Sequence, residues 1–157
     1  MLKIAVLVDV QNIYYTTRDA FAKQFNYREF WQQLSQRGEI VIANAYAIDK
    51  GDMQQGKFQN ALKHIGFNVK LKPFIQRSDG SAKGDWDVGI TIDALEAAKD
   101  IDCLVLLSGD GDFDLLLATL KHKHQCRTVV YGVPQLTANS LVNAADEFIK
   151  IDDSLLL

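Results

Sequence analysis

Closely spaced aspartates follow one of the most apolar stretches of this 157-residue sequence. Residues 104–107 (Leu-Val-Leu-Leu) predict a strand buried on both faces, and Asp110 and Asp112 follow where that strand leaves the core. Two like charges about 5 Å apart repel each other by about 3 kcal/mol at an effective dielectric of 20. Carboxylates so placed either retain a proton or bind a cation. We interpret this stretch as half of a metal site.

Two further aspartates are predicted to reach the same place from other elements. Asp9 ends the apolar first strand, residues 2–8, and Asp87 lies in the first turn of a helix expected from about residue 85 to 99. In a doubly wound sheet of strand order 3-2-1-4-5, the first and fourth strands are neighbours about 5 Å apart, and their carboxyl ends form the ligand-binding edge. The helix before the fourth strand runs antiparallel to it, so Asp87 arrives at this edge. The expected metal ligands, which are also the expected catalytic residues, are Asp9, Asp87, Asp110 and Asp112.

The donor set of this pocket indicates a hard cation. Four carboxylates and the amide of Asn12, without a set of Cys and His, are the all-oxygen ligands that suit Mg²⁺ or Mn²⁺ better than Zn²⁺. Such an ion can orient water for in-line attack on a phosphodiester, and no covalent nucleophile stands out in the sequence. Lys83 is a candidate phosphate anchor, and Asn12 and Ser108 are candidates to orient ligands or substrate.

Two other aspartates near the pocket are weaker candidates for metal ligands. Asp93 lies six residues after Asp87, about 9 Å along the helix and about 120° around it, so both contact one ion only if the helix bends. Asp114 either faces the cluster or interacts with a helix N-terminus. Both are expected to contact the metal ligands and not the metal itself. Taken alone, Asp112 is equally well explained as a helix N-cap, and Lys83 also fits a solvated loop lysine.

The rest of the chain alternates strands and helices. Apolar runs bounded by Gly, Pro and polar residues predict strands, and apolar side chains three to four residues apart predict helices. Strands are expected at residues 2–8, 39–48, 67–75, 102–108 and 126–131, with a further short one at 148–151. Helices are expected within residues 13–37 and at 53–65, 85–99, 113–124 and 137–145. The alternation predicts an α/β protein: one domain over residues 1–157, with three α/β/α layers and a mostly parallel, doubly wound sheet of about five strands.

The composition limits the cellular compartments and the binding partners that fit this chain. Cys103 and Cys126 lie in apolar stretches and are expected to be small core residues. No uninterrupted apolar run reaches about 18 residues, so we expect no membrane span, and the setting that fits is cytoplasmic. The net charge of −3 excludes a polycation, so nucleic-acid contact requires a local basic patch. The best-placed basic residues are Lys70, Lys72, Arg77 and Lys83, with Lys57 and Lys63 less well placed.

Three segments carry the residues singled out above. They are residues 8–12 (Val-Asp-Val-Gln-Asn), residues 83–88 (Lys-Gly-Asp-Trp-Asp-Val) with 92–95 (Ile-Asp-Ala-Leu), and residues 108–113 (Ser-Gly-Asp-Gly-Asp-Phe). In this order and spacing they resemble the NYN family, LabA-like branch, of the PIN-like nuclease superfamily. The resemblance covers the chain from end to end. One departure is Val10-Gln11, where a Gly-containing step is more common, and it leaves the acidic set intact.

The resemblance implies a PIN-like fold and a divalent-metal-dependent ribonuclease. RNA is then the expected substrate, with DNA as the alternative polymer. The acidic family positions fall on Asp9, Asp87, Asp110 and Asp112, and further recurrent family positions fall on Asn12, Lys83, Asp93 and Ser108.

Two other functions stay open at this point. One is a nucleic-acid-binding or regulatory interaction domain that keeps the acidic pocket without turnover. The other is a different phosphoryl-transfer enzyme, because Asp110-Gly111-Asp112 is similar to the DxD of topoisomerase-primase folds. The absence of a Glu at the end of the first strand argues against the latter.

Overall fold

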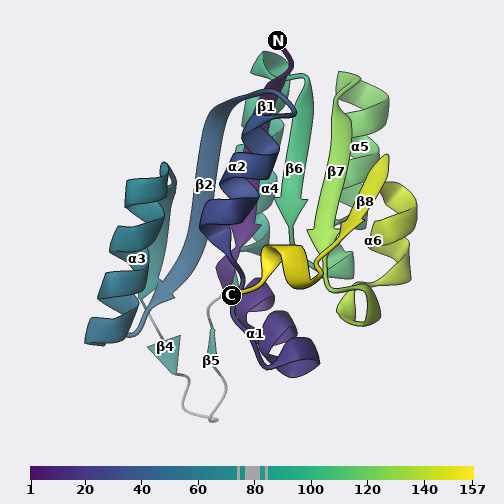
Figure 1. The fold of residues 1–157 in the computed structure, drawn as a ribbon. Coiled ribbons are helices and arrows are strands. Elements are labelled where there is room, and N and C mark those ends of the chain that lie inside the picture. The colour runs from purple at the N-terminus through teal and green to yellow at the C-terminus, as the bar shows by residue number, and fades with distance from the viewer. Residues whose placement is uncertain (74, 77–81, 84) are drawn as a thin grey trace.

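The centre of the fold is a six-stranded sheet in which all neighbouring strands are parallel (Figure 1). The computed structural model describes residues 1–73, 75, 76, 82, 83 and 85–157, with side chains outside residues 74–84. The strand order is β3-β2-β1-β6-β7-β8. This order confirms the doubly wound arrangement predicted for the first five strands. The short stretch near residue 148 adds a sixth strand at one edge.

The bounds of the elements lie close to those expected. The sheet strands are β1 Lys3–Asp9, β2 Glu39–Asp49, β3 Asn68–Pro73, β6 Cys103–Leu107, β7 Arg127–Gly132 and β8 Glu147–Lys150; an antiparallel pair is formed by β4 Ile75–Gln76 and β5 Ala82–Lys83. The α-helices are α1 Val10–Phe21, α2 Tyr27–Ser35, α3 Met53–Ile65, α4 Asp87–Ala97, α5 Asp114–His124 and α6 Asn139–Ala144. Short 3-10 turns are η1 Ala98–Asp100, η2 Gly111–Phe113, η3 Pro134–Leu136 and η4 Asp153–Leu155. None of the helices in the described ranges is long and apolar enough to cross a membrane.

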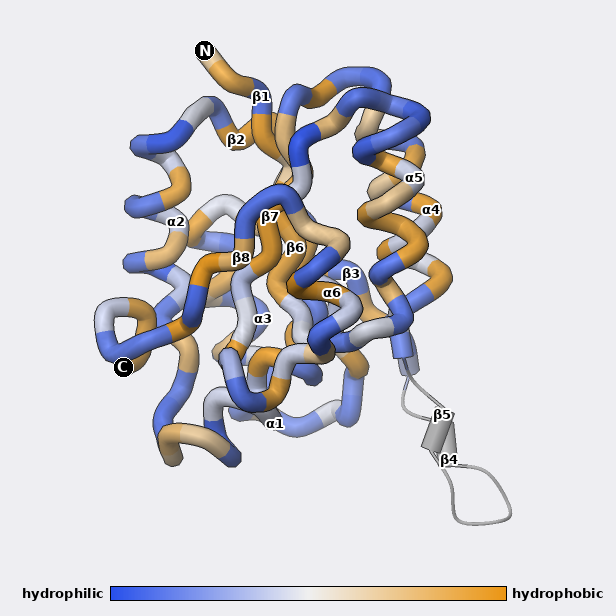
Figure 2. Tube along the Cα trace, turned by 90° about the vertical axis from the view of Figure 1, so that its right-hand side faces the viewer, coloured by the Kyte–Doolittle hydropathy of each residue, from blue (hydrophilic) through white to orange (hydrophobic). Residues whose placement is uncertain are grey.

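Two layers of helices cover the sheet. Helices α1, α2 and α3 bury Ile13, Phe30 and Leu62 against one face. Helices α4, α5 and α6 pack on the other face, where Ile90 and Leu117 are fully buried. Figure 2 shows hydrophobic residues gathered along β6 and β7, while the outer turns of α2 are largely hydrophilic. The predicted three-layer α/β/α architecture is therefore confirmed.

The two central strands deliver their carboxyl ends to one place. Strands β1 and β6 are neighbours, with Val8 opposite Leu107. All five residues of β6 are buried, as expected for a strand with helices on both faces. Asp9, the last residue of β1, and Ser108, the first residue after β6, therefore emerge together at the carboxyl edge of the sheet. In Figure 1 this is the lower edge, where the arrows of β6 and β7 end.

Helix boundaries follow local signals. Asp52 caps α3 by accepting a hydrogen bond from the backbone N–H of Gln55 (2.7 Å), and Asn26 caps α2 in the same way. Gly66 ends α3 with a φ of 135°, and a Cβ there would lie 2.8 Å from the ring of Trp31. The two N-caps fix the helix ends that lie next to the carboxyl edge, and Gly66 fixes α3 at its other end.

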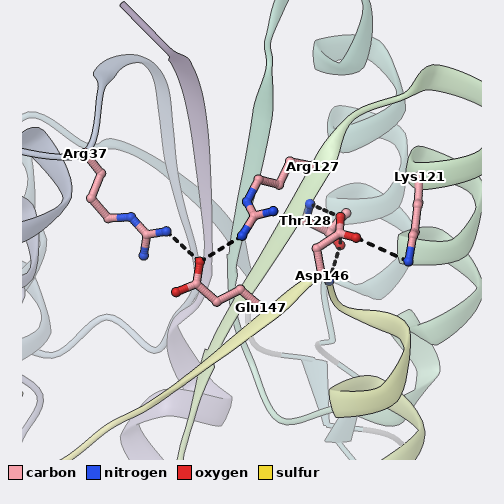
Figure 3. Close-up of polar contacts among 6 residues, drawn as sticks. All are labelled: Arg37, Lys121, Arg127, Thr128, Asp146 and Glu147. Atoms are coloured by element: carbon pink, nitrogen blue, oxygen red, sulfur yellow. Dashed lines mark hydrogen bonds and ion pairs between the residues drawn. The ribbon is translucent and has the colours of Figure 1, made fainter.

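Ion pairs fasten the edge strand β8 at the amino end of the sheet (Figure 3). The Glu147 carboxylate accepts hydrogen bonds from Arg37 (2.6 Å) and Arg127 (3.3 Å). The Asp146 carboxylate pairs with Lys121 (3.2 Å) and accepts the backbone N–H of Thr128 (2.9 Å). We call these residues the amino-edge network: Arg37, Lys121, Arg127, Thr128, Asp146 and Glu147.

The two cysteines are core residues, as predicted. Cys103 and Cys126 are both buried and free. Burial raises the pKa of each thiol to about 11, so neither is a reactive thiolate at neutral pH.

Candidate metal centre

A network of hydrogen bonds joins the end of β1 to the loop after β6. Ser108 Oγ donates to Asp9 Oδ2 (3.1 Å) and accepts from the backbone N–H of Asp110 (3.2 Å). The backbone N–H of Gly109 donates to Oδ1 of Asn12, in the first turn of α1 (2.9 Å). Ser108 and Asn12, which were predicted to orient ligands or substrate, thus hold the Asp110 loop against β1 and α1.

The loop leaves no room for a side chain at Gly109. A Cβ there would lie 2.6 Å from the carbonyl oxygen of Leu136 and 3.2 Å from Cα of Thr137. The Gly109 carbonyl also accepts a hydrogen bond from the backbone N–H of Ala138 (3.0 Å). Asp110 is therefore presented from a turn that is fixed on two sides.

Three of the four predicted carboxylates come together at this edge. Asp87, Asp110 and Asp112 each offer one oxygen, and these oxygens lie within 4.8 Å of one another. Asp87 reaches the edge because it is the first residue of α4, which runs antiparallel to the strands. Asp110 Oδ1 also accepts the backbone N–H of Asp112 (2.9 Å) and so caps η2. The N-cap alternative for Asp112 is wrong, because Asp110 does the capping and the exposed Asp112 carboxylate stands beside it.

Asp9 is linked to these three through Ser108 and through charge. Burial raises the pKa of Asp9 to about 6, the hydrogen bonds of Ser108 and Asn12 oppose the rise, and the charges of Asp110 and Asp85 add to it. Burial also raises the pKa of Asp87 to about 7, reinforced first by Asp110. We call the four residues the aspartate cluster: Asp9, Asp87, Asp110 and Asp112.

No basic side chain compensates the aspartate cluster in the part of the chain whose side chains the structure describes. None of the ion pairs found there includes any of the four carboxylates. Like charges gathered without a counterion favour protonation, which is the direction of the pKa shifts at Asp9 and Asp87. A bound cation would reverse this preference.

Asp93 lies in a different environment. Its Oδ2 accepts hydrogen bonds from Lys70 Nζ and from the Tyr46 hydroxyl, each at 2.8 Å. Burial alone would raise its pKa, but these two partners lower it below the ordinary value. Asp93 is thus a compensated carboxylate, and the structure does not bring it into the group formed by Asp87, Asp110 and Asp112.

Asp114 and Lys83 are the two remaining residues that the sequence predicted near the site. Asp114 is the first residue of α5, where the helix dipole stabilises its negative charge. It is not among the three clustered carboxylates. The backbone of Lys83 pairs with Ile75 in the β4–β5 hairpin. The Lys83 side chain lies outside the described residues, as do residues 77–81 between the two strands.

Sequence reasoning did not assign a role to Asp85. Its Oδ1 accepts the backbone N–H of Asp87 (3.2 Å), and its charge raises the pKa of both Asp9 and Asp87. The signal was present in the sequence, because Asp85 precedes Asp87 by two residues, just before α4 begins. It makes the edge still more negative than the aspartate cluster alone.

A family model for the NYN domain matches residues 3–152. The chain belongs to the NYN domain family. This NYN chain is 31% identical over 159 residues to the Low amplitude and bright protein LabA of Synechococcus elongatus, covering 96% of this chain and 84% of that protein. A crystal structure of a Vibrio parahaemolyticus protein of unknown function superposes with a TM-score of 0.95 at 53% identity, covering 99% of this chain and 96% of the other.

The NYN family is a PIN-like nuclease family, and its members typically use divalent metals. The donor set of this NYN chain fits such an ion. The clustered groups are all carboxylates, no Cys or His of the described residues joins them, and an all-oxygen set suits a hard cation. The aspartate cluster would hold the ion, while Ser108 and Asn12 keep Asp9 and Asp110 in place around it.

Proposed function

We propose that this NYN domain hydrolyses RNA phosphodiesters with Mg²⁺ or Mn²⁺ held by the aspartate cluster. The observation that carries the proposal is the convergence of Asp87, Asp110 and Asp112 within 4.8 Å at the carboxyl edge, without a basic partner among the described side chains. That edge is where α/β folds of this kind bind their ligands. Membership of a nuclease family supplies the reaction class.

In this proposal some residues of the site bind the cation and others hold those residues in position. A divalent cation in the site would supply Lewis acidity and lower the pKa of a bound water. Ser108 Oγ and Asn12 Oδ1 hold the Asp110 loop against β1 and α1, which would keep Asp9 and Asp110 in position around the ion. Lys83 remains the proposed phosphate anchor, beside the N-terminus of α4.

We also propose that residues 1–157 form one NYN unit that acts in the cytoplasm. The family model spans residues 3–152, which supports a single unit. The two free, buried cysteines suit a reducing compartment.

The test is cleavage of labelled single-stranded RNA, and of DNA of the same sequence, with Mn²⁺, Mg²⁺ or EDTA. We expect metal-dependent cleavage of RNA by the wild type, and loss of cleavage both in EDTA and in Asp110→Asn. The matched control is Asp100→Asn, which changes an exposed aspartate in η1 at the opposite edge of the sheet. Metal-dependent cleavage by Asp110→Asn at the wild-type rate would show that the assignment is wrong.

The same assays address the two other functions. A binding or regulatory domain predicts no cleavage by folded wild type at any metal concentration, together with RNA binding that survives Asp110→Asn. A phosphatase-like enzyme predicts turnover of small phosphate esters, which we do not expect here.

A further inference from the structure

A cavity of about 560 Å³ opens next to the first turns of α1, which follow Asp9 in the chain. Val10 and Ile13, which line it, directly follow Asp9 and Asn12 in the chain. Tyr27 lines it as well, and the charge of Asp9 adds to the effect of burial in raising the pKa of the Tyr27 hydroxyl. The cavity therefore adjoins Asp9, one member of the aspartate cluster, and lies between α1, the start of α2 and the first turns of α3.

The inner wall of the cavity is aromatic. Phe25, Tyr27 and Phe58 line it, and Tyr27 meets the two phenylalanine rings edge to face, with centroids at 4.8 Å and 5.7 Å. Tyr27 is only 7% exposed, yet its hydroxyl has no hydrogen-bond partner among the described residues. No fully buried polar side-chain atom in that part of the chain lacks a partner, so this hydroxyl is not fully buried, and Tyr27 is among the residues that line the cavity.

The rim of the cavity combines exposed aromatic rings with polar and basic groups. Tyr15 is 37% exposed, and the guanidinium of Arg18 lies 4.8 Å from its ring centroid. From the opposite side, the first turns of α3 contribute the exposed side chains of Gln54 and Lys57. Lys57 was one of the two basic residues judged less well placed in the sequence, and the fold puts it in the lining of this cavity.

We propose that the cavity receives one unstacked nucleobase of a single-stranded RNA whose backbone crosses the aspartate cluster. A nucleobase is a flat ring with a polar edge, which matches an aromatic wall carrying a phenol hydroxyl and a rim with an amide and an ammonium group. The volume lies in the range of small-molecule pockets. The proposal rests on the proposed function, because the neighbouring aspartates are what make a phosphodiester the adjoining group. It adds the substrate class: an unpaired strand with a base at this position.

The first experiment measures the binding of a fluorescent single-stranded RNA in EDTA by anisotropy. Gln54→Trp fills the cavity from its exposed rim, and Tyr15→Ala removes an aromatic ring there. Met53→Trp is the matched control, because Met53 is 82% exposed on the same helix and does not line the cavity. We expect each cavity variant to bind at least about fivefold more weakly than the wild type, and Met53→Trp to bind as the wild type does.

The second experiment removes single bases from the RNA and keeps the backbone charge. One abasic position should weaken binding to the wild type by a similar factor, and the same position should have no effect on Gln54→Trp. Equal binding by Gln54→Trp and Met53→Trp, or the absence of any sensitive position, would overturn the proposal. Thermal melting of each variant confirms that it is folded.

Cleavage assays separate this inference from the proposed function. If the wild type shows the base-dependent binding but never cleaves RNA, the cavity assignment stands and the nuclease assignment fails. If the wild type cleaves RNA with Mn²⁺ and the cavity variants bind and cleave as Met53→Trp does, the nuclease assignment stands and the cavity assignment fails.

Discussion

The carboxylates at the two edges of the sheet differ in whether a basic side chain pairs with them and in the direction of their pKa shifts. At the amino edge, Glu147 is paired with Arg37 and Arg127, and these partners lower its pKa. At the carboxyl edge, Asp9 and Asp87 have no basic partner among the described side chains, and burial and neighbouring aspartates raise their pKa to about 6 and about 7. The same chemical group is compensated where it fastens a strand and left uncompensated where a ligand is expected.

This difference has a thermodynamic meaning. A carboxylate whose pKa falls on folding stabilises the folded state once it is ionised, whereas one whose pKa rises destabilises it. The amino-edge network therefore contributes to the fold at neutral pH. In the absence of a cation, ionised Asp9 and Asp87 cost stability, as expected for a site selected for function.

The largest expected effect concerns cleavage. Asp110→Asn should lower the rate of metal-dependent RNA cleavage by more than about 100-fold, because changing a partner behind a metal ligand already costs 10- to 100-fold. Glu147→Gln, at the other edge, should leave the rate within twofold of the wild type, roughly the scatter of such assays. Single-turnover cleavage with saturating Mn²⁺ measures both. Equal losses in the two variants would break the comparison between the edges.

The second effect is stabilisation by the cation. At 100 times its dissociation constant, Mn²⁺ should add about 2.7 kcal/mol to the free energy of unfolding, which is about 5–10 °C in melting temperature for a chain of this size. The rise should be lost in Asp110→Asn and retained in Glu147→Gln. Differential scanning calorimetry with Mn²⁺ and with EDTA measures it. A rise of the same size in Asp110→Asn would place the ion elsewhere.

The third effect is a gain of stability from removing a candidate ligand. The folded pKa of Asp87 is raised to about 7 from 3.8, so its ionisation costs stability increasingly as pH rises from 3.8 through 7. In EDTA at neutral pH, Asp87→Asn should be more stable than the wild type by about 1 kcal/mol, a value reduced because the side chain is only half-buried and solvent screens it. The gain should disappear at a pH below 3.8. Asp100→Asn, the exposed control, should show no gain in urea denaturation at either pH.

The sequence predicted the parts of this comparison that depend on strand order. The apolar runs of β1 and β6 were enough to place Asp9 and the loop that carries Asp110 at the same edge of the sheet. The partner of Asp93 was not predictable, because Lys70 lies on β3 and meets α4 only through tertiary packing. The cavity was missed for the same reason, since its walls come from α1, α2 and α3, and only the assembled fold brings Lys57 and Tyr27 to one cavity.

The smallest expected effect tests the amino edge alone. The hydrogen bond from Arg37 is the main cause that lowers the pKa of Glu147 below its ordinary value of 4.5. Its contribution to stability is therefore complete above pH 4.5 and is lost as pH falls through the lowered pKa. Glu147→Gln should be less stable than the wild type by at most about 1 kcal/mol at neutral pH, since the pair is partly exposed. This loss of stability is opposite in sign to the change expected for Asp87→Asn, and it should vanish in strong acid. Arg37→Gln should cause the same loss. If Glu147→Gln instead stabilised the metal-free protein, the two edges would not differ in the way their pKa shifts indicate.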